Sequence, residues 1–266
     1  MKKRADVILF EKGLVESREK AKRVIMEGAV FIGDRRVEKP GEKLHEDSEI
    51  FIKENPISYV SRGGLKLEKA IELFAIDMKN IVAMDIGAST GGFTDCMLKN
   101  GASKVYAVDV GYGQLDWKLR NDSRVVVMER TNIRNVGIEH IGGDVDFISI
   151  DVSFISLRLV LPVAKDLLKD SGEVVALIKP QFEAGKDKVG KKGIIRDKNV
   201  HLEVLESVAS FSNNLGFGIK GVTFSPITGA TGNIEFLIYL EKGGINKVDS
   251  ESILNLVESA HIELSK

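Results

Sequence analysis

Three charged residues lie at or inside stretches of sequence that are otherwise apolar. Asp151 and Lys179 each follow directly after a strand-like apolar run, and Glu235 interrupts a third. Burying such charges is costly unless they pair, so they indicate either a structural ion-pair network or a catalytic site. A lysine beside carboxylates suits chemistry at a hydroxyl group, because a neutral lysine can accept a proton and an ammonium group can stabilise a developing alkoxide.

A glycine-rich turn at residues 81–93 joins a predicted strand to a predicted helix. Glycines let the backbone approach a ligand closely, and the start of a helix favours negative groups. A dinucleotide-binding fingerprint needs a glycine where this chain has Ser89. Asp85 precedes the first glycine by two residues and would repel a pyrophosphate. It suits the amino end of S-adenosylmethionine, directly or through water.

Asp109 ends the next predicted strand, where a carboxylate can accept hydrogen bonds from both ribose hydroxyls. We therefore favour S-adenosylmethionine over NAD as the cofactor. In the alternative reading, Asp85 caps a turn and Asp109 ends a strand in some other α/β protein. The residues expected to contact the cofactor are Asp85, Gly87, Ser89, Gly91, Gly92 and Asp109, with Asn132 reaching the adenine.

The residues after Asp151 help to decide which kind of group is methylated. A methylase acting on a base amino group usually has Pro-Pro and an aromatic residue after its Asn or Asp, whereas this chain has Val152, Ser153 and Phe154. A hydroxyl nucleophile is therefore favoured over an exocyclic amine.

Strands and helices alternate from residue 81 onward, which predicts a mostly parallel sheet covered on both faces. The last two strands have no helix between them and should form an antiparallel edge. The predicted strands are 81–86, 104–110, 124–128, 145–150, 173–178, 220–224 and 233–240. The predicted helices are 92–99, 115–120, 157–168 and 201–215.

The first 54 residues predict a small α+β domain. Ser17 can cap a helix that ends at Gly28, and two short strands follow at 29–32 and 49–53. Asn55-Pro56 interrupts the pattern, so we place a linker at 55–62 and the larger domain at 63–266.

Composition limits the classes of function. The 38 Lys and Arg residues against 39 Asp and Glu residues give a net charge of −1, so a nucleic-acid role must rest on local basic patches. The single cysteine excludes an internal disulfide, and the four histidines show no metal-ligand spacing, so we expect no metal. No apolar run approaches the ~18 residues of a membrane span, and we expect a cytoplasmic protein.

Together these motifs resemble the TlyA family of bacterial ribosomal RNA 2′-O-methyltransferases, often called hemolysin A. The resemblance implies an FtsJ-like, Rossmann-type α/β methyltransferase domain with a seven-stranded, mostly parallel sheet. It also implies a catalytic Lys–Asp–Lys–Glu tetrad at Lys66, Asp151, Lys179 and Glu235. Lys66 is assigned to the tetrad by the resemblance alone. Without it, a lysine on a helix would be interpreted as an ordinary solvent-exposed charge. The matching stretches are Ser61–Leu67, Asp85–Asp95, Asp151–Ser156, Ile178–Glu183 and Gly232–Glu235.

The N-terminal domain resembles the alpha-L RNA-binding domain of a small-subunit ribosomal protein. Residues 1–23 contain eight Lys and Arg against four Asp and Glu, and the loop 184–198 contains six against two. Such charges could lie over phosphates, which supply affinity but little sequence information. The candidate RNA-binding residues are Arg4, Arg18, Lys22, Lys186 and Lys188.

The resemblance implies S-adenosylmethionine-dependent methylation of a ribose 2′-hydroxyl, of cytidine, in ribosomal RNA. The expected partner is ribosomal RNA or a ribosomal subunit, with no DNA, no membrane and a monomeric state. Two alternatives are a non-catalytic RNA-binding or ribosome-assembly factor and a membrane-lytic hemolysin. The intact acid, lysine and glycine positions disfavour the first, and the lack of an apolar span disfavours the second.

Overall fold

The computed structural model describes residues 2–26, 28–33, 35–52, 59–190 and 193–264. The chain divides into two compact units, Met1–Arg62 and Gly63–Lys266. Each unit has its own buried apolar cluster, as expected of a separate domain. Residue 53, expected to end a strand, and residues 55–58 of the expected linker lie outside the described residues.

In its described residues, the smaller unit combines two helices with two small antiparallel sheets. One sheet pairs β1 with β4, and the other has the order β3-β2-β5. Ser17 accepts a hydrogen bond from the backbone N–H of Lys20 at 3.1 Å, so the predicted helix cap is present. The first helix was not predicted. The elements are β1 (Lys2–Arg4), α1 (Ala5–Glu11), α2 (Arg18–Met26), β2 (Val30–Ile32), β3 (Arg35–Arg36), β4 (Lys43–His45) and β5 (Ile50–Ile52).

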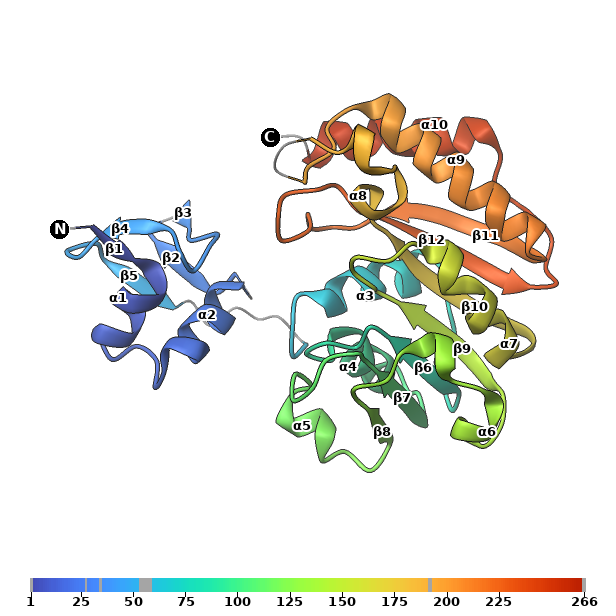
Figure 1. Ribbon diagram of the computed structural model, residues 1–266, viewed down its shortest axis with the longest axis horizontal. Helices are drawn as coiled ribbons and strands as arrows, with labels where there is room; N and C mark the ends of the chain where they lie inside the picture. The colour runs from blue at the N-terminus through green and yellow to red at the C-terminus, as the bar shows by residue number, and fades with distance from the viewer. Residues whose placement is uncertain (1, 27, 34, 53–58, 191–192, 265–266) are drawn as a thin grey trace. The chain divides into compact units, whose positions relative to one another are not determined.

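The larger unit alternates strands and helices until its last two strands (Figure 1). The strands are β6 (Val82–Ile86), β7 (Lys104–Val108), β8 (Val125–Met128), β9 (Val145–Ile150), β10 (Leu168–Ile178), β11 (Phe217–Phe224) and β12 (Phe236–Lys242). The helices are α3 (Gly63–Phe74), α4 (Gly92–Lys99), α5 (Trp117–Arg120), α6 (Ile138–Ile141), α7 (Leu161–Leu167), α8 (Pro180–Glu183), α9 (Lys198–Asn214) and α10 (Ser250–Leu264). Short 3-10 helices occupy Ile133–Asn135, Leu157–Leu159 and Lys186–Lys188.

Within the described residues, seven strands form one sheet in the order β11-β12-β10-β9-β6-β7-β8. Neighbouring strands from β10 to β8 are parallel, whereas β12 runs antiparallel to both β10 and β11. The predicted fold class is therefore confirmed. So is the antiparallel pairing of the last two strands, although β12 lies inside the sheet and β11 forms its edge.

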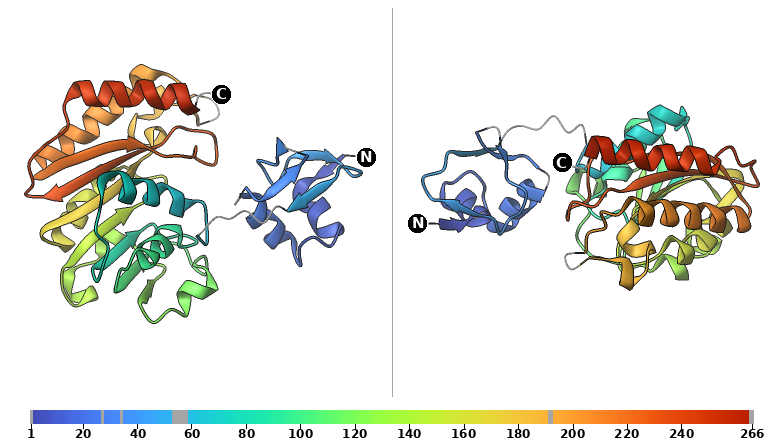
Figure 2. Two further views of the ribbon diagram at one scale, coloured as in Figure 1. Left: turned by 180° about the vertical axis from the view of Figure 1, so that it is seen from behind. Right: turned by 90° about the horizontal axis from the view of Figure 1, so that it is seen from above.

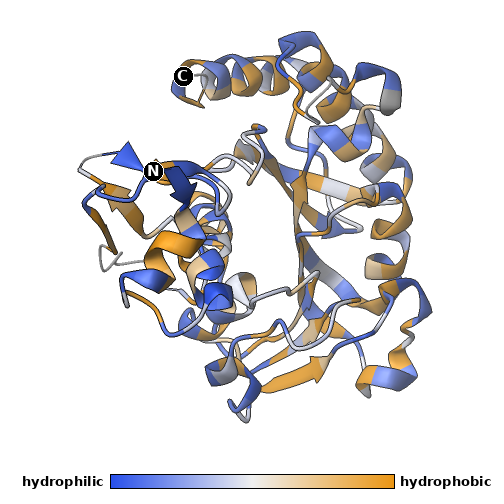
Figure 3. Ribbon diagram, turned by 60° about the vertical axis from the view of Figure 1, so that its left-hand side comes forward, coloured by the Kyte–Doolittle hydropathy of each residue, from blue (hydrophilic) through white to orange (hydrophobic). Residues whose placement is uncertain are grey.

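Helices cover both faces of this sheet, with α3 on one face and α9 on the other (Figure 2). Alternation along β12 shows the same division: Tyr239 stacks on Phe74 of α3, while Ile238 and Leu240 join the cluster that contains Val204 of α9. Because both faces are covered, most strand residues of the sheet are apolar and drawn in orange in Figure 3, whereas the start of β10 is polar and exposed at Lys169–Ser171.

Two predicted helices are shorter in the structure, and the helices α6, α8 and α10 were not predicted. The stretch 157–168 divides into a 3-10 helix and α7, and Pro162 in the first turn of α7 marks the new start. The stretch 115–120 forms a helix from Trp117 onward, because Asp116 caps it by accepting a hydrogen bond from Lys118 N at 2.9 Å. Helix α10 packs on α9 and β11 and was not predicted.

Candidate active site

The charged residues at the strand ends meet at one end of the strands, where β9 and β10 finish and β12 begins. Asp151 follows the last residue of β9, and Lys179 follows the last residue of β10. Glu235 precedes the first residue of β12, and because β12 is antiparallel, its amino end lies at the carboxyl ends of β9 and β10. The register pairs Ile178 with Phe236, which places Lys179 and Glu235 on adjacent strands.

Lys66, on the first turns of α3, completes an alternating chain of acids and bases. Its Nζ atom donates to Glu235 Oε2 at 2.6 Å and lies 3.8 Å from Asp151 Oδ2. Lys179 Nζ lies 2.6 Å from Asp151 Oδ1. Lys66, Lys179 and Glu235 are 8%, 8% and 3% exposed, so the structure brings all four predicted tetrad residues into one largely buried cluster.

The electrostatics of the cluster keep Asp151 ionised. Burial alone would raise the pKa of Asp151, but the positive charges of Lys66 and Lys179 outweigh it and lower that pKa. Two ammonium groups and two carboxylates balance formally, which is how buried charges become tolerable.

A pocket of about 450 Å³ lies beside this cluster, within the usual size range of ligand sites. Asp151 and Ser153 belong to its lining, and Lys179 donates a hydrogen bond to Ser153 Oγ at 3.0 Å. Lys179 does not line the pocket itself, but it contacts two residues that do, Asp151 and Ser153. The other lining residues come from the ends of β6 and β7 and from the segments that follow β6, β7, β8 and β9: Ile86, Gly87, Ser89, Val108, Asp109, Val110, Gln114, Thr131, Asn132, Ile133, Val152, Phe154, Ile155 and Val160.

Polar groups expected to hold a cofactor lie at the far side of this pocket. The Asp109 carboxylate accepts hydrogen bonds from the backbone N–H groups of Ser89 at 2.8 Å and Gly111 at 2.7 Å. Each carboxylate oxygen has two acceptor positions, so capacity remains for a ribose diol. Asn132 Oδ1 accepts from Arg134 N at 3.1 Å, so the group that Asn132 could offer a ligand is its amide nitrogen.

The predicted glycines shape the turn in different ways. Gly87 lines the pocket with φ +87°, and a Cβ there would lie 2.4 Å from the carbonyl oxygen of Asp151. Gly91 precedes α4 with φ +98°, and a Cβ there would meet Leu119. Gly92 is the buried first residue of α4. Gly91 and Gly92 do not line the pocket, so the structure gives them a role in packing the turn.

Asp85 is fully buried and does not line the pocket. Its carboxylate accepts hydrogen bonds from Thr94 N at 2.8 Å, Thr94 Oγ1 at 2.7 Å and Ser149 Oγ at 3.2 Å. Burial, and to a smaller extent the Asp151 charge, raises the pKa of Asp85 to about 7. The structure therefore places Asp85 beneath the turn, where it ties β6 to α4 and β9.

Phe154 is a site residue that the sequence reasoning did not identify as functional. Its ring is 91% exposed beside the pocket, its φ is +64°, and it packs on Phe182 at 5.1 Å between ring centroids. A left-handed conformation is costly for a bulky residue, and such strain gathers at functional sites. The available signal was the aromatic residue three positions after Asp151.

In the smaller unit, two of the predicted RNA-binding residues form ion pairs with the same buried aspartate. Asp6 is fully buried and accepts two hydrogen bonds from the Arg4 guanidinium, both at 2.9 Å. Arg18 reaches the same carboxylate at 3.5 Å. The Arg4 hydrogen bond, assisted by the charges of Arg4 and Arg18, lowers the pKa of Asp6. Lys22 pairs with Glu19 at the surface at 3.6 Å.

The two predicted lysines of the loop 184–198 lie in the 3-10 helix Lys186–Lys188. Lys188 forms an exposed ion pair with Glu203 on α9, while the side chain of Lys186 lies outside the described residues.

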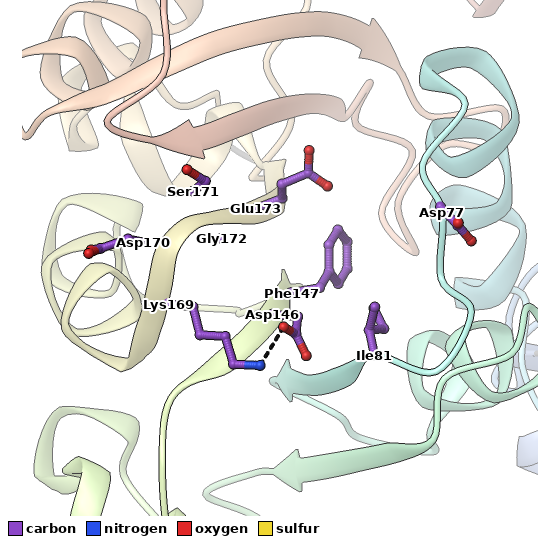
Figure 4. Close-up of a pocket in the computed structure, with 9 residues that line it drawn as sticks. All are labelled: Asp77, Ile81, Asp146, Phe147, Lys169, Asp170, Ser171, Gly172 and Glu173. Carbon is purple, nitrogen blue, oxygen red and sulfur yellow. Dashed lines mark hydrogen bonds and ion pairs between the residues drawn. The ribbon is translucent and has the colours of Figure 1, made fainter.

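A second pocket of about 220 Å³ lies at the opposite end of the strands, where β6 and β9 begin (Figure 4). Lys169 points to Asp146 across it, with Nζ 2.6 Å from Oδ1. The charged atoms of this pair are as far apart as those of Lys179 and Asp151. The pair lies where β6 and β9 begin, however, whereas the glycine-rich turn follows the carboxyl end of β6. Among the described residues, no group of His, Cys, Asp and Glu side chains is arranged to hold a metal ion.

Comparisons with known proteins agree on both units. The FtsJ-like methyltransferase family model matches residues 59–242, and the S4 domain model matches residues 3–50. YqxC of Bacillus subtilis is 54% identical over 270 aligned positions, covering 100% of this chain and 96% of the relative. The Mycobacterium tuberculosis protein named 16S/23S rRNA (cytidine-2′-O)-methyltransferase TlyA is 42% identical over 238 positions, covering 89% of each.

A solved structure from Streptococcus thermophilus, described as a hemolysin, covers 99% of this chain and 97% of its own. Its TM-score is 0.80 at 50% identity. Nowhere in the described part of the present chain is there a helix with both the length and the apolar character needed to cross a membrane.

Proposed function

The chain belongs to the TlyA-like family of FtsJ-like methyltransferases with an S4 domain, and from that premise we propose its reaction. It transfers the methyl group of S-adenosylmethionine to a ribose 2′-hydroxyl of cytidine in ribosomal RNA. The larger unit performs the chemistry, and the S4 unit supplies RNA affinity.

The observation that carries this proposal is the contact between the buried acid–base chain and the pocket, through Asp151 in the lining and through the hydrogen bond from Lys179 to Ser153. Lys66, Asp151, Lys179 and Glu235 come from four distant segments, yet successive charged atoms lie 2.6 to 3.8 Å apart. An ion-pair network that served stability alone would gain nothing from opening into a 450 Å³ pocket beside a glycine-rich turn. Charged groups with perturbed pKa values in a cleft are typical of active sites.

The pocket chemistry fits S-adenosylmethionine. The Asp109 carboxylate suits a ribose diol, the Asn132 amide suits an adenine edge, and apolar lining residues such as Val110 and Ile133 suit the faces of the base. When bound, this cofactor supplies an electrophilic methyl group attached to a positively charged sulfur.

The chain's own residues must orient the ribose hydroxyl and remove its proton. Lys179 Nζ stands beside Asp151 and Ser153 at the pocket and is our candidate for contacting that hydroxyl, as a base or as the ammonium partner of the alkoxide. Asp151 fixes Lys179, and Glu235 fixes Lys66 within reach of Asp151. The carboxylates thereby hold two like charges close together without leaving either unpaired.

Two features support RNA as the substrate. Arg4 and Arg18 converge on Asp6, so their guanidinium groups are ordered before any phosphate arrives. Phe154 offers an exposed ring beside the pocket, where a base turned out of its stack could rest. We expect Lys22, Lys186 and Lys188 to add phosphate contacts.

Methyl transfer to ribosomal RNA by the Lys179→Ala variant tests the proposal. We expect single-turnover methylation to fall by about a hundredfold or more, while calorimetric affinity for S-adenosylmethionine stays within about twofold. If Lys179 is the base, Lys179→Arg should also fail, because a guanidinium group does not give up its proton.

Lys169→Ala provides a matched control. It removes an ion pair of the same 2.6 Å length at the opposite edge of the sheet. Its methylation rate should remain near that of the wild type. The methylated nucleoside should appear as 2′-O-methylcytidine on mass spectrometry of digested RNA. Methylation by Lys179→Ala at the rate of Lys169→Ala would make the tetrad merely structural.

A further inference from the structure

Asn233 is fully buried two residues before Glu235, and both polar atoms of its side-chain amide have partners. Its Oδ1 atom accepts a hydrogen bond from the backbone N–H of Ile195 at 2.9 Å. Its Nδ2 atom donates to the carbonyl of Gly193 at 2.8 Å and to Thr231 Oγ1 at 3.0 Å. The side chain therefore pairs with the backbone at Gly193 and Ile195 as a neighbouring strand would, across about forty residues of sequence.

The backbone of Asn233 holds a turn against the Glu235 carboxylate. Its carbonyl accepts a hydrogen bond from Gly229 N at 2.9 Å. Gly229 lies so close to Glu235 that a Cβ on it would stand 2.4 Å from Oε1. The carbonyl of Glu235 in turn accepts from Ser225 N at 2.8 Å. The turn 225–235 thus wraps around the carboxylate that orients Lys66.

We infer that Asn233 is a positioning residue for the methyl-transfer reaction. By fixing the turn 225–235 to residues 193–195, it sets where the Glu235 carboxylate stands and, through Glu235, where Lys66 and Asp151 stand. The inference rests on the proposed function and deepens it. Asn233 has no place in the pocket lining, so its removal should not affect cofactor binding directly.

The Asn233→Ala variant separates positioning from binding. Small displacements of catalytic groups cost up to about a hundredfold in rate, so we expect kcat at saturating RNA to fall by roughly ten- to a hundredfold. Affinity for S-adenosylmethionine, measured by calorimetry, should stay within about twofold. Hydrogen exchange at the Ile195 amide should accelerate, because the acceptor of its hydrogen bond is gone.

Asn100→Ala is the matched control, since Asn100 also makes a side-chain hydrogen bond to the backbone, donating to the Cys96 carbonyl at 2.9 Å at the end of α4. It should lower stability without lowering kcat. Asn233→Asp keeps the shape and the acceptor for Ile195 but loses the donor to Gly193, and it should also lower kcat. If the alanine variant does not fold, the kcat of Asn233→Asp still tests the inference.

A kcat for Asn233→Ala within about twofold of wild type, with the Ile195 amide deprotected, would overturn the inference. Loss of cofactor binding in both Asn233 variants would overturn it too, since the residue would then serve stability alone. An inactive wild type would instead refute the proposed function. In that case an unchanged Ile195 exchange rate in the variants would still reject the anchoring contact.

Discussion

Replacing Lys66 by methionine should destabilise the larger unit far more than the loss of one surface charge would. Lys66 is 8% exposed, and Glu235, its partner at 2.6 Å, is 3% exposed. Methionine matches the length and apolar character of the lysine stem, so the change removes mainly the ammonium group. It leaves the Glu235 carboxylate buried without that partner, and it removes a cation 3.8 Å from Asp151.

The magnitude follows from the distances. With an effective dielectric constant of about 20, unit charges 2.6 Å apart attract by about 6 kcal/mol, before the cost of removing them from water. Removing one partner of a buried pair typically costs about 3–5 kcal/mol, because the other charge stays buried and uncompensated. We expect a loss in this range for Lys66→Met. The double variant Lys66→Met/Glu235→Gln removes both charges and should recover most of it.

Denaturant unfolding of the wild type, both single variants and the double variant completes the cycle. The single tryptophan, Trp117, lies in the larger unit, so its fluorescence follows that unit. Methylation should be absent in the double variant despite its recovered stability. The prediction would be refuted if Lys66→Met lost less than about 1 kcal/mol of unfolding free energy, or if the double variant were no more stable than Lys66→Met.

Three further predictions follow from other contacts. Asp109→Ala should weaken S-adenosylmethionine binding at least about tenfold in calorimetry, because hydrogen bonds to a charged acceptor are worth about 1.5–3 kcal/mol each, and unchanged affinity would remove Asp109 from the site. Gly87→Ala should cost about 2–4 kcal/mol in unfolding free energy, since φ is +87° and its Cβ would press on the Asp151 carbonyl; a melting temperature equal to wild type would contradict this. Burial, and then His261, lowers the pKa of His201 from 6.5 to about 4, so the unfolded chain binds the proton first. The contribution of His201 to the unfolding free energy should therefore fall by about 3 kcal/mol as the pH drops from about 6.5 to 4. Because the raised pKa of Asp85 changes stability in the opposite direction over this range, the measurement is the difference in unfolding free energy between the wild type and His201→Gln, which should move in favour of the variant by that amount on acidification, and an unchanged difference would contradict the prediction.

The sheet and three tetrad residues could be predicted because each leaves a clear mark in the sequence. Apolar runs identify buried strands, and a charge at the end of such a run is expensive enough to need an explanation, as with Asp151, Lys179 and Glu235. The antiparallel direction of β12 also mattered, because it brings Glu235 to the edge where Asp151 and Lys179 end their strands.

Other features depend on contacts that no local pattern encodes. Lys66 lies on a helix, where lysine is common, and only its burial against Glu235 distinguishes it. Asp85 was expected to meet the cofactor, but the direction of a side chain at the end of a strand decides between pocket and interior. In the structure that direction favours Thr94 and Ser149. Asn233 acquires its role from a backbone segment about forty residues away.

The hydrogen bond between Lys66 and Glu235 joins residues 169 positions apart, which has a consequence for how the protein becomes active. Closing so long a loop is entropically costly, and contacts of high sequence separation form slowly during folding. Domains fold largely in the order of their synthesis, so the S4 unit can be complete while β12 is still being made. The residues that line the pocket end at Val160, well before Glu235 emerges. A nascent chain can thus acquire its S4 unit and much of its pocket before it acquires Glu235, which completes the proposed tetrad.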